Sequence, residues 1–152
     1  MIYTPILGTL GYVMSTDGQK ILLLYRNKRE DDHYKGKYIG LGGKLKPDED
    51  IITGLRREVF EESGLECEKV SLCGTINWLN LDKEEDSWFG FVFRIDRYRG
   101  TPLLENPEGT LSWISTDDVH KLPMSEGDYN FLPLVLKNSR QFHGVMIRKN
   151  NK

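Results

Sequence analysis

Three glutamates near the middle of the chain have the spacing of a metal-binding site. Glu58, Glu61 and Glu62 lie in a segment with helical periodicity, and at about 100° per residue their side chains gather on one part of the helix surface. Carboxylates held this close repel one another and lose hydration, so they favour a proton or a cation. Mg²⁺ prefers oxygen ligands, and the spacing therefore predicts a divalent cation site, for Mg²⁺ first and Mn²⁺ as the alternative. A Glu-Glu pair alone would instead be typical of a solvated helix end.

The helix that carries these glutamates has start and stop signals. Pro47 and Asp48 stand where a helix begins, with Asp48 as the expected N-cap, and Gly64 stands where a left-handed residue ends one. Glu62 falls within the apolar side of this helix and should be partly buried. The apolar residues on that side are Ile51, Ile52, Leu55 and Val59.

A glycine-rich loop precedes the helix. Gly42 and Gly43 allow the backbone to approach a metal ion or a phosphate closely, and the Gly43 carbonyl oxygen is a candidate cation ligand. With Lys44 they form the expected substrate-binding loop. Arg26 ends an earlier predicted strand in a basic cluster, where it is a candidate for binding a substrate phosphate; a solvated turn is the competing interpretation.

The complete pattern from Gly43 to Leu65 is more specific than any of its parts. It reads Gly, five residues, Glu, seven residues, Arg-Glu, an aliphatic residue, any residue, Glu-Glu, any residue, Gly and an aliphatic residue. This pattern resembles the Nudix box, and all nine specified positions match. A chance match in a chain of this length has a probability on the order of 10⁻⁷ at ordinary residue usage.

The resemblance implies a fold and a set of residue roles. Nudix hydrolases are α/β proteins, α/β/α sandwiches with a central mixed sheet, that hold one to three divalent cations against a diphosphate linked to another group. Glu49 and Arg57 would orient the segment as an ion pair, and either Glu61 or Glu58 would take the proton from the attacking water. By position, the implied metal ligands are Glu58, Glu61, Glu62 and the Gly43 carbonyl.

Beyond this segment, the chain resembles the MutT-like purine nucleoside triphosphatases of the family. Glu108 stands five residues before Trp113, as a glutamate does in those enzymes, and is a candidate additional ligand or base. Asp128 matches one of the two aspartates in the oxidised-purine enzymes and is a candidate for binding the base edge. Ile39 and Ser125 depart from the pattern, because they replace an asparagine that recognises the purine and a tryptophan that stacks on it.

The implied reaction is Mg²⁺-dependent hydrolysis of a nucleoside triphosphate to monophosphate and pyrophosphate, with 8-oxo-dGTP or a related oxidised purine nucleotide as the expected substrate and nucleotide-pool sanitation as the role. Two alternatives stay open: a pyrophosphatase for ADP-ribose or another nucleoside diphosphate derivative, and a non-catalytic nucleotide-binding regulatory module. Residues 80–82 lack the proline of ADP-ribose enzymes and the tyrosine of dinucleoside polyphosphate hydrolases. The intact set of three glutamates disfavours the regulatory module.

Apolar patterning outside this segment favours the same architecture. A hairpin turn is predicted at Asp17-Gly18, and a second helix opens at Gly127-Asp128. The aromatic residues of 87–98 are interpreted as core and sheet-face residues rather than as a base-stacking platform. Strands are predicted at residues 2–14, 20–25, 38–41, 67–78, 87–98, 111–114 and 141–147.

Length, charge and cysteine content limit the classes of protein to consider. The 152 residues are expected to form one domain, 1–152, and the net charge of −2 disfavours binding to a nucleic-acid polymer. Cys67 and Cys73 match no zinc pattern and are expected to be reduced thiols in a cytoplasmic protein. Neither a basic leader nor a long apolar run predicts export or a membrane span. A monomer and a homodimer are both compatible with the sequence.

Overall fold

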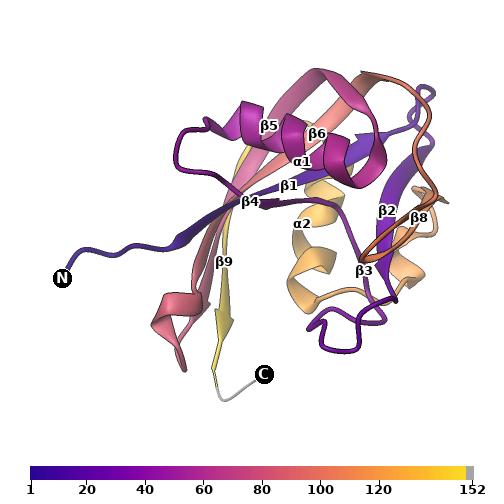
Figure 1. The fold of residues 1–152 in the computed structure, drawn as a ribbon. Helices are drawn as coiled ribbons and strands as arrows, with labels where there is room; N and C mark the ends of the chain where they lie inside the picture. Colours follow the sequence, from indigo (N-terminus) through magenta and orange to yellow (C-terminus); the bar gives the residue numbers. More distant parts are fainter. Residues whose placement is uncertain (150–152) are drawn as a thin grey trace.

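The computed structural model describes residues 1–149, in which one mixed sheet separates two α-helices (Figure 1). The elements in chain order are β1 (Ile6–Met14), β2 (Lys20–Arg26), β3 (Tyr38–Ile39), β4 (Leu41–Lys44), α1 (Ile51–Ser63), β5 (Glu66–Asn80), η1 (Glu84–Asp86), β6 (Trp88–Arg99), β7 (Glu105–Asn106), β8 (Gly109–Ser115), η2 (Val119–Lys121), α2 (Glu126–Lys137) and β9 (Phe142–Arg148).

The sheet is mixed in strand direction. Its order is β7-β8-β2-β1-β6-β5-β9, and the short strands β3 and β4 pair with β2 and β1. The β1–β6 and β5–β9 pairs are parallel, whereas the other pairs are antiparallel. The expected α/β/α sandwich with a central mixed sheet is confirmed. No helix within residues 1–149 is long and apolar enough to cross a membrane.

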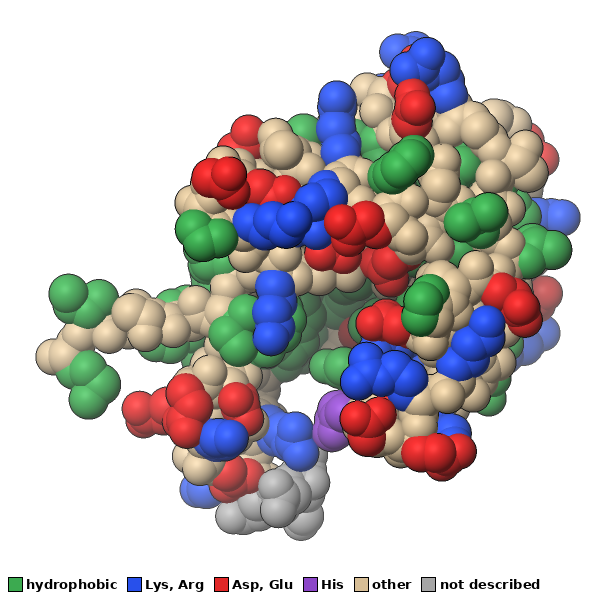
Figure 2. Space-filling model, in the orientation of Figure 1, with side chains coloured by type: hydrophobic (Ala, Val, Ile, Leu, Met, Phe, Trp, Pro, Cys, Tyr) green, Lys and Arg blue, Asp and Glu red, His purple; other side chains and the backbone are tan. Residues whose placement is uncertain are grey.

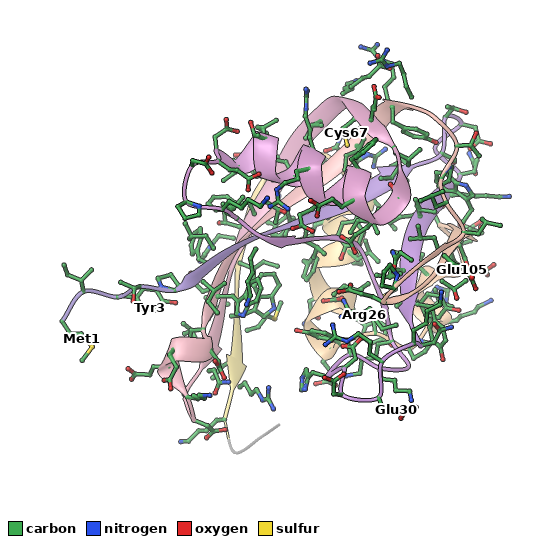
Figure 3. The ribbon with its side chains drawn as sticks, in the orientation of Figure 1. Met1, Tyr3, Arg26, Glu30, Cys67 and Glu105 are labelled. Carbon is green, nitrogen blue, oxygen red and sulfur yellow. The ribbon has the colours of Figure 1, made fainter. Side chains whose placement is uncertain are left out.

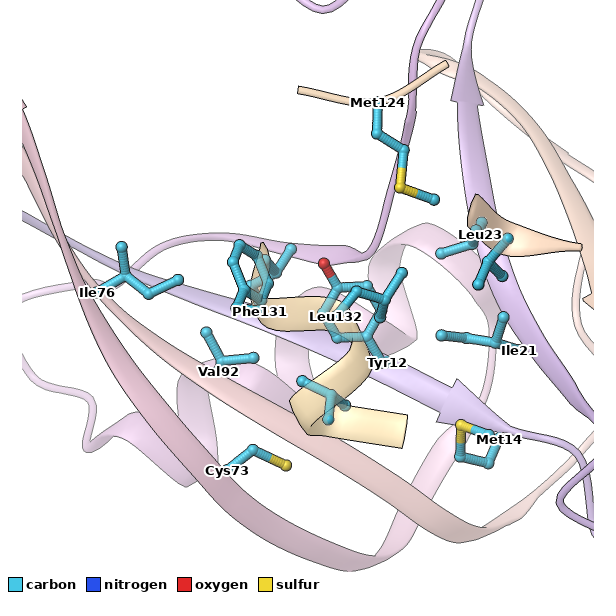
Figure 4. Packing of buried hydrophobic residues seen from close by; sticks show 13 residues of the cluster. Tyr12, Met14, Ile21, Leu23, Cys73, Ile76, Val92, Met124, Phe131 and Leu132 are labelled. Atoms are coloured by element: carbon cyan, nitrogen blue, oxygen red, sulfur yellow. The ribbon is translucent and has the colours of Figure 1, made fainter. Parts of the chain in front are cut away.

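Each face of the sheet has its own core, because successive side chains along a strand point to opposite faces. On β1, Tyr12 packs with the α2 side chains Phe131 and Leu132 (Figure 4), whereas its neighbour Val13 packs with Leu55 of α1. Apolar burial on both faces therefore fixes how α1 and α2 sit relative to the strands between them.

The turns differ little from the sequence prediction. Asp17 and Gly18 form the β1–β2 hairpin turn, in which Gly18 has a positive φ of 74° and the Asp17 carboxylate accepts hydrogen bonds from Ser15 and Gln19. The strand predicted over 38–41 is instead two strands separated at Gly40, where an added Cβ would lie 2.8 Å from the Gly11 carbonyl oxygen.

Helix α1 begins two residues later than the sequence predicts. Pro47 and Asp48 form a turn, so Asp48 is not the N-cap. Asp50 is the N-cap, because its carboxylate accepts hydrogen bonds from the backbone N–H groups of Ile52 and Thr53. Gly64 ends the helix in the left-handed conformation with a φ of 77°, as predicted.

The cap assignment predicts different costs for two nearby substitutions. Asp50→Ala leaves two amide groups of α1 without their acceptor and should lower the free energy of unfolding by about 1 kcal/mol. Asp48→Ala, the matched control in the exposed turn, should change it by less than about 0.5 kcal/mol. Urea denaturation of both variants measures the difference. An equal or larger loss for Asp48→Ala would show that the helix is capped from the turn.

Candidate active site

One guanidinium group connects the acidic residues at the α1–β4 junction. Arg57 donates from Nε and Nη2 to both carboxylate oxygens of Glu49, and from Nη2 to the Lys44 carbonyl at 3.1 Å. Its Nη1 donates to Glu58 Oε1 at 2.7 Å and to Glu61 Oε2 at 3.3 Å. The hydrogen bonds from Arg57, followed by one from the Lys46 backbone, lower the pKa of Glu49 to about 2. Glu49 therefore stays charged and holds the arginine in place.

Gly43 lets the helix approach the strand closely enough to bring Glu58 against it. A Cβ on Gly43 would lie 2.6 Å from the carboxyl carbon of Glu58, closer than real side chains come. A side chain at position 43 would therefore push the flexible end of Glu58 away from β4.

Glu62 lies deeper and in a less polar environment. Its Oε1 accepts a hydrogen bond of 2.8 Å from the Gly42 backbone N–H. Burial raises the pKa of Glu62 to about 8, and the nearby charges of Glu108 and Glu58 add to the shift. The carboxyl group of Glu62 therefore holds a proton at neutral pH unless another positive charge takes the place of that proton.

The carboxylate oxygens of this site are ligands of the type that a hard divalent cation prefers. Glu58, Glu62 and Glu108 provide carboxylate oxygens near one another, and the cradle at Gly43 is filled by a carboxylate. Within residues 1–149, however, no three acidic, histidine or cysteine side chains converge as a finished ligand cage. Glu58 and Glu61 share the Arg57 guanidinium instead, which keeps their like charges apart.

Arg26 lies beside this cluster and is itself held by carboxylates. Its Nε donates to Asp32 Oδ2 at 2.6 Å, and its Nη1 lies 3.3 Å from Glu108 Oε2. Figure 3 shows Arg26 between the loop that carries Glu30 and the strand pair that carries Glu105. Sequence reasoning missed Asp32, whose side chain is only 4% exposed, because its loop offered no periodic pattern.

The other predicted binding residue, Asp128, lies apart from the glutamates in the first turn of α2. It is buried, and this burial raises its pKa to about 7 against a smaller opposing effect of Lys37. Asp128 in turn contributes to the raised pKa of Tyr12, whose fully buried hydroxyl has no hydrogen-bond partner within residues 1–149. Tyr12 was not identified from sequence, because its neighbours in the predicted strand made it look like an ordinary core residue.

The acidic cluster borders an open hollow. Figure 2 shows this hollow in the molecular surface, with a group of Asp and Glu side chains on one side and hydrophobic side chains within it. Lys44, which the sequence predicts to bind substrate, has its Nζ 5.8 Å from the ring centroid of Trp88. A phosphate-bearing ligand could therefore meet both the carboxylate cluster and the cationic side chains of Arg26 and Lys44.

A helix with clustered carboxylates, packed on a glycine strand in an α/β/α sandwich, defines the class of Nudix-type pyrophosphohydrolases. The NUDIX domain family model matches residues 5–135, and the chain belongs to the Nudix family. It is 31% identical over 135 residues to the uncharacterized Nudix hydrolase YvcI of Bacillus subtilis (strain 168), covering 88% of this chain and 81% of that protein.

Two further relatives carry more specific names. The oxidized purine nucleoside triphosphate hydrolase of Danio rerio is 34% identical over 108 residues, which cover 69% of this chain and 66% of that protein. The MutT protein of Bacillus halodurans has a crystal structure that superposes with a TM-score of 0.84 at 28% identity, covering 96% of this chain and 92% of that chain. The chain is a Nudix pyrophosphohydrolase.

The environment of Asp128 predicts a pH-dependent difference in stability. Its pKa is about 7 in the fold and near 3.8 in the unfolded chain, so the folded state binds the proton more tightly. The stability contributed by protonated Asp128 is fully present below about pH 4 and is lost as the pH rises to about 7. Over this range the free energy of unfolding falls by up to about 1.4 kcal/mol per pH unit. Asp128→Asn cannot ionise and should therefore gain stability relative to the wild type over this range.

Urea denaturation between pH 5 and pH 8 measures this difference. Glu126→Gln, which removes an exposed carboxylate from the same turn of α2, is the matched control. Its free energy of unfolding should change with pH as that of the wild type does. A constant difference between Asp128→Asn and the wild type across the range would contradict the raised pKa of Asp128.

Proposed function

We propose that the protein is a Mg²⁺-dependent nucleoside triphosphate diphosphatase acting on 8-oxo-dGTP or a related oxidised purine nucleotide, with nucleotide-pool sanitation as its role. The carrying observation is that Glu58 and Glu62 both lie against the glycine strand β4, where Glu62 accepts from the Gly42 N–H and Arg57 joins Glu58 to Glu61. The similarity to the zebrafish oxidized purine nucleoside triphosphate hydrolase supports the purine class.

The residues at the α1–β4 junction have distinct proposed roles. Glu58, Glu61, Glu62 and the Gly43 carbonyl would hold the cation, with Mn²⁺ as an alternative to Mg²⁺. When bound, such a cation neutralises phosphate oxygens and lowers the pKa of bound water. Arg57 orients the carboxylates through its pair with Glu49, and Gly43 leaves room for the Glu58 carboxylate against β4.

The proton of the attacking water goes to a carboxylate. Glu61 is the better candidate than Glu58, because it is 53% exposed and makes the longer of the two contacts with Arg57. Glu108 would add charge beside Glu62 as a further ligand or base. Arg26, which Asp32 and Glu108 hold beside this cluster, would bind a phosphate together with Lys44.

Recognition of the base would fall to Asp128. With a pKa near 7, this buried carboxyl group can either donate or accept a hydrogen bond at neutral pH. The unpaired hydroxyl of Tyr12 supplies a second polar atom close to it. A purine carries donors and acceptors along the same edge, so this pair suits it chemically.

A turnover panel tests the proposal. With Mg²⁺, the protein should release pyrophosphate and monophosphate from 8-oxo-dGTP in preference to dGTP, other nucleoside triphosphates and ADP-ribose. Glu61→Gln should lower kcat by about 100-fold or more. The control Glu66→Gln removes an exposed carboxylate from β5 and should leave kcat unchanged. Preferred cleavage of ADP-ribose would overturn the substrate assignment, and an unchanged kcat in Glu61→Gln would overturn its role.

The cradle at Gly43 predicts a second loss of activity. Gly43→Ala places a methyl group 2.6 Å from the Glu58 carboxyl carbon, and displacing this carboxylate by about 1 Å should lower kcat/KM by about 100-fold. Gly144→Ala is the control, because a Cβ there meets only Ile76, at an ordinary contact distance of 3.9 Å. Similar kcat/KM values for the two variants would mean that activity does not depend on the position of Glu58 against β4.

A further inference from the structure

Asn106 is a buried polar residue at the turn between β7 and β8. It pairs with Gly109 in the antiparallel register, so that Pro107 and Glu108 form the connection between the two strands. The carboxamide oxygen of Asn106 accepts hydrogen bonds from the backbone N–H groups of Glu108 at 2.9 Å and Gly109 at 3.1 Å. Asparagine often holds a turn through its own side chain in this way. The Asn106 side chain therefore fixes the backbone at Glu108.

The nitrogen of the same carboxamide reaches the end of α1. Asn106 Nδ2 donates a hydrogen bond of 3.1 Å to the backbone carbonyl of Glu62, the residue before the last of this helix. Carbonyl groups in the last turn of a helix have no partner within the helix and need one from outside. One side chain therefore joins the backbone of Glu62 to the backbone of Glu108.

The turn also packs closely against the end of β2. Gly109 pairs with Arg26 in the β2–β8 register, and a Cβ on Gly109 would lie 1.9 Å from the Tyr25 carbonyl oxygen. The Arg26 guanidinium then lies 3.3 Å from the Glu108 carboxylate. Arg26 thus orients the side chain of Glu108, whereas Asn106 sets the position of its backbone.

The two glutamates that Asn106 joins carry like charges. The charge of Glu108 acts on the carboxyl group of Glu62. Because like charges repel, a turn without a restraint would carry Glu108 away from Glu62. Holding the turn itself requires only the carboxamide oxygen of Asn106. Its donor to α1 is the group that relates this turn to the helix of the acidic site.

We infer that Asn106 is a positioning residue, which holds Glu108 close to Glu62 so that both carboxylates face the same cation. The inference rests on the proposed function, in which Glu108 is a further ligand, and adds the residue that keeps this ligand in place. Backbone groups engage both the oxygen and the nitrogen of the carboxamide. Asn106 therefore acts through Glu108 and not on the substrate itself.

A double-mutant cycle between Asn106 and Glu108 tests the inference. With the nucleotide that the wild type hydrolyses fastest, Asn106→Ala should lower kcat about 10-fold and change KM less than about twofold, because only the position of Glu108 is lost. In the Glu108→Gln background, Asn106→Ala should lower kcat by less than about twofold. An equal loss of kcat in both backgrounds, or no loss in the wild-type background, would overturn the inference.

Two further variants separate positioning from stability. Asn106→Ser keeps an acceptor for the turn but is too short to reach the Glu62 carbonyl, so it should stay folded and lose kcat as Asn106→Ala does. Asn80 is the matched control, because its side-chain oxygen accepts from the backbone N–H groups of Asp82 at 3.1 Å and Lys83 at 3.0 Å, in a turn that leads to η1. Asn80→Ala should lower the free energy of unfolding and leave kcat unchanged. An unchanged kcat in a folded Asn106→Ser, or an equal loss of kcat in Asn80→Ala, would contradict the positioning role.

Binding of Mn²⁺ alone provides a readout that needs no turnover. Electron paramagnetic resonance of free Mn²⁺ should give an about 10-fold higher Kd for Asn106→Ala than for the wild type, and less than about a twofold difference in the Glu108→Gln background. If the wild type hydrolyses no nucleotide but shows this coupling, the proposed function fails and the inference stands. If nucleotides are hydrolysed and the coupling is absent, the positioning role alone is wrong. A wild type that neither binds Mn²⁺ nor hydrolyses a nucleotide would overturn both.

Discussion

The arrangement of the acidic site depends on one partly buried network of ion pairs. Arg57 contacts the side chains of Glu49, Glu58 and Glu61 and the carbonyl of Lys44, so a single charged group joins α1 to both the preceding loop and β4. Arginine suits this position because its planar fork donates in several directions and stays charged. Arg57 is therefore the counter-charge that Glu58 and Glu61 share.

The sheet fixes the position of this network. Antiparallel pairing of β4 with β1 sets Gly43 opposite Thr9, and α1 is held over that junction by its own core of Leu55 and Val59. On the other face α2 brings Asp128 close to Tyr12. Asp128 and Tyr12 therefore belong to the α2 side of the sheet, whereas the carboxylates of α1 belong to the opposite side.

Local signals predicted α1 well, but its exact start depended on tertiary structure. The spacing of Glu58, Glu61 and Glu62 and the stop at Gly64 follow from helical periodicity and glycine conformation. Asp48 and Asp50 both satisfy the N-cap preference, and only the turn at Pro47 separates them. Asp32, the partner of Arg26, was beyond prediction, because its contact depends on the conformation of a loop.

Direct Mn²⁺ binding tests the proposal that α1 carries the cation site, without reference to any substrate. Electron paramagnetic resonance of free Mn²⁺ during a titration gives the Kd for the wild type, Glu58→Gln, Glu62→Gln and the surface control Glu66→Gln. We expect about tenfold weaker binding or more in Glu58→Gln and Glu62→Gln, and unchanged binding in Glu66→Gln. Wild-type affinity in both Glu58→Gln and Glu62→Gln would contradict it.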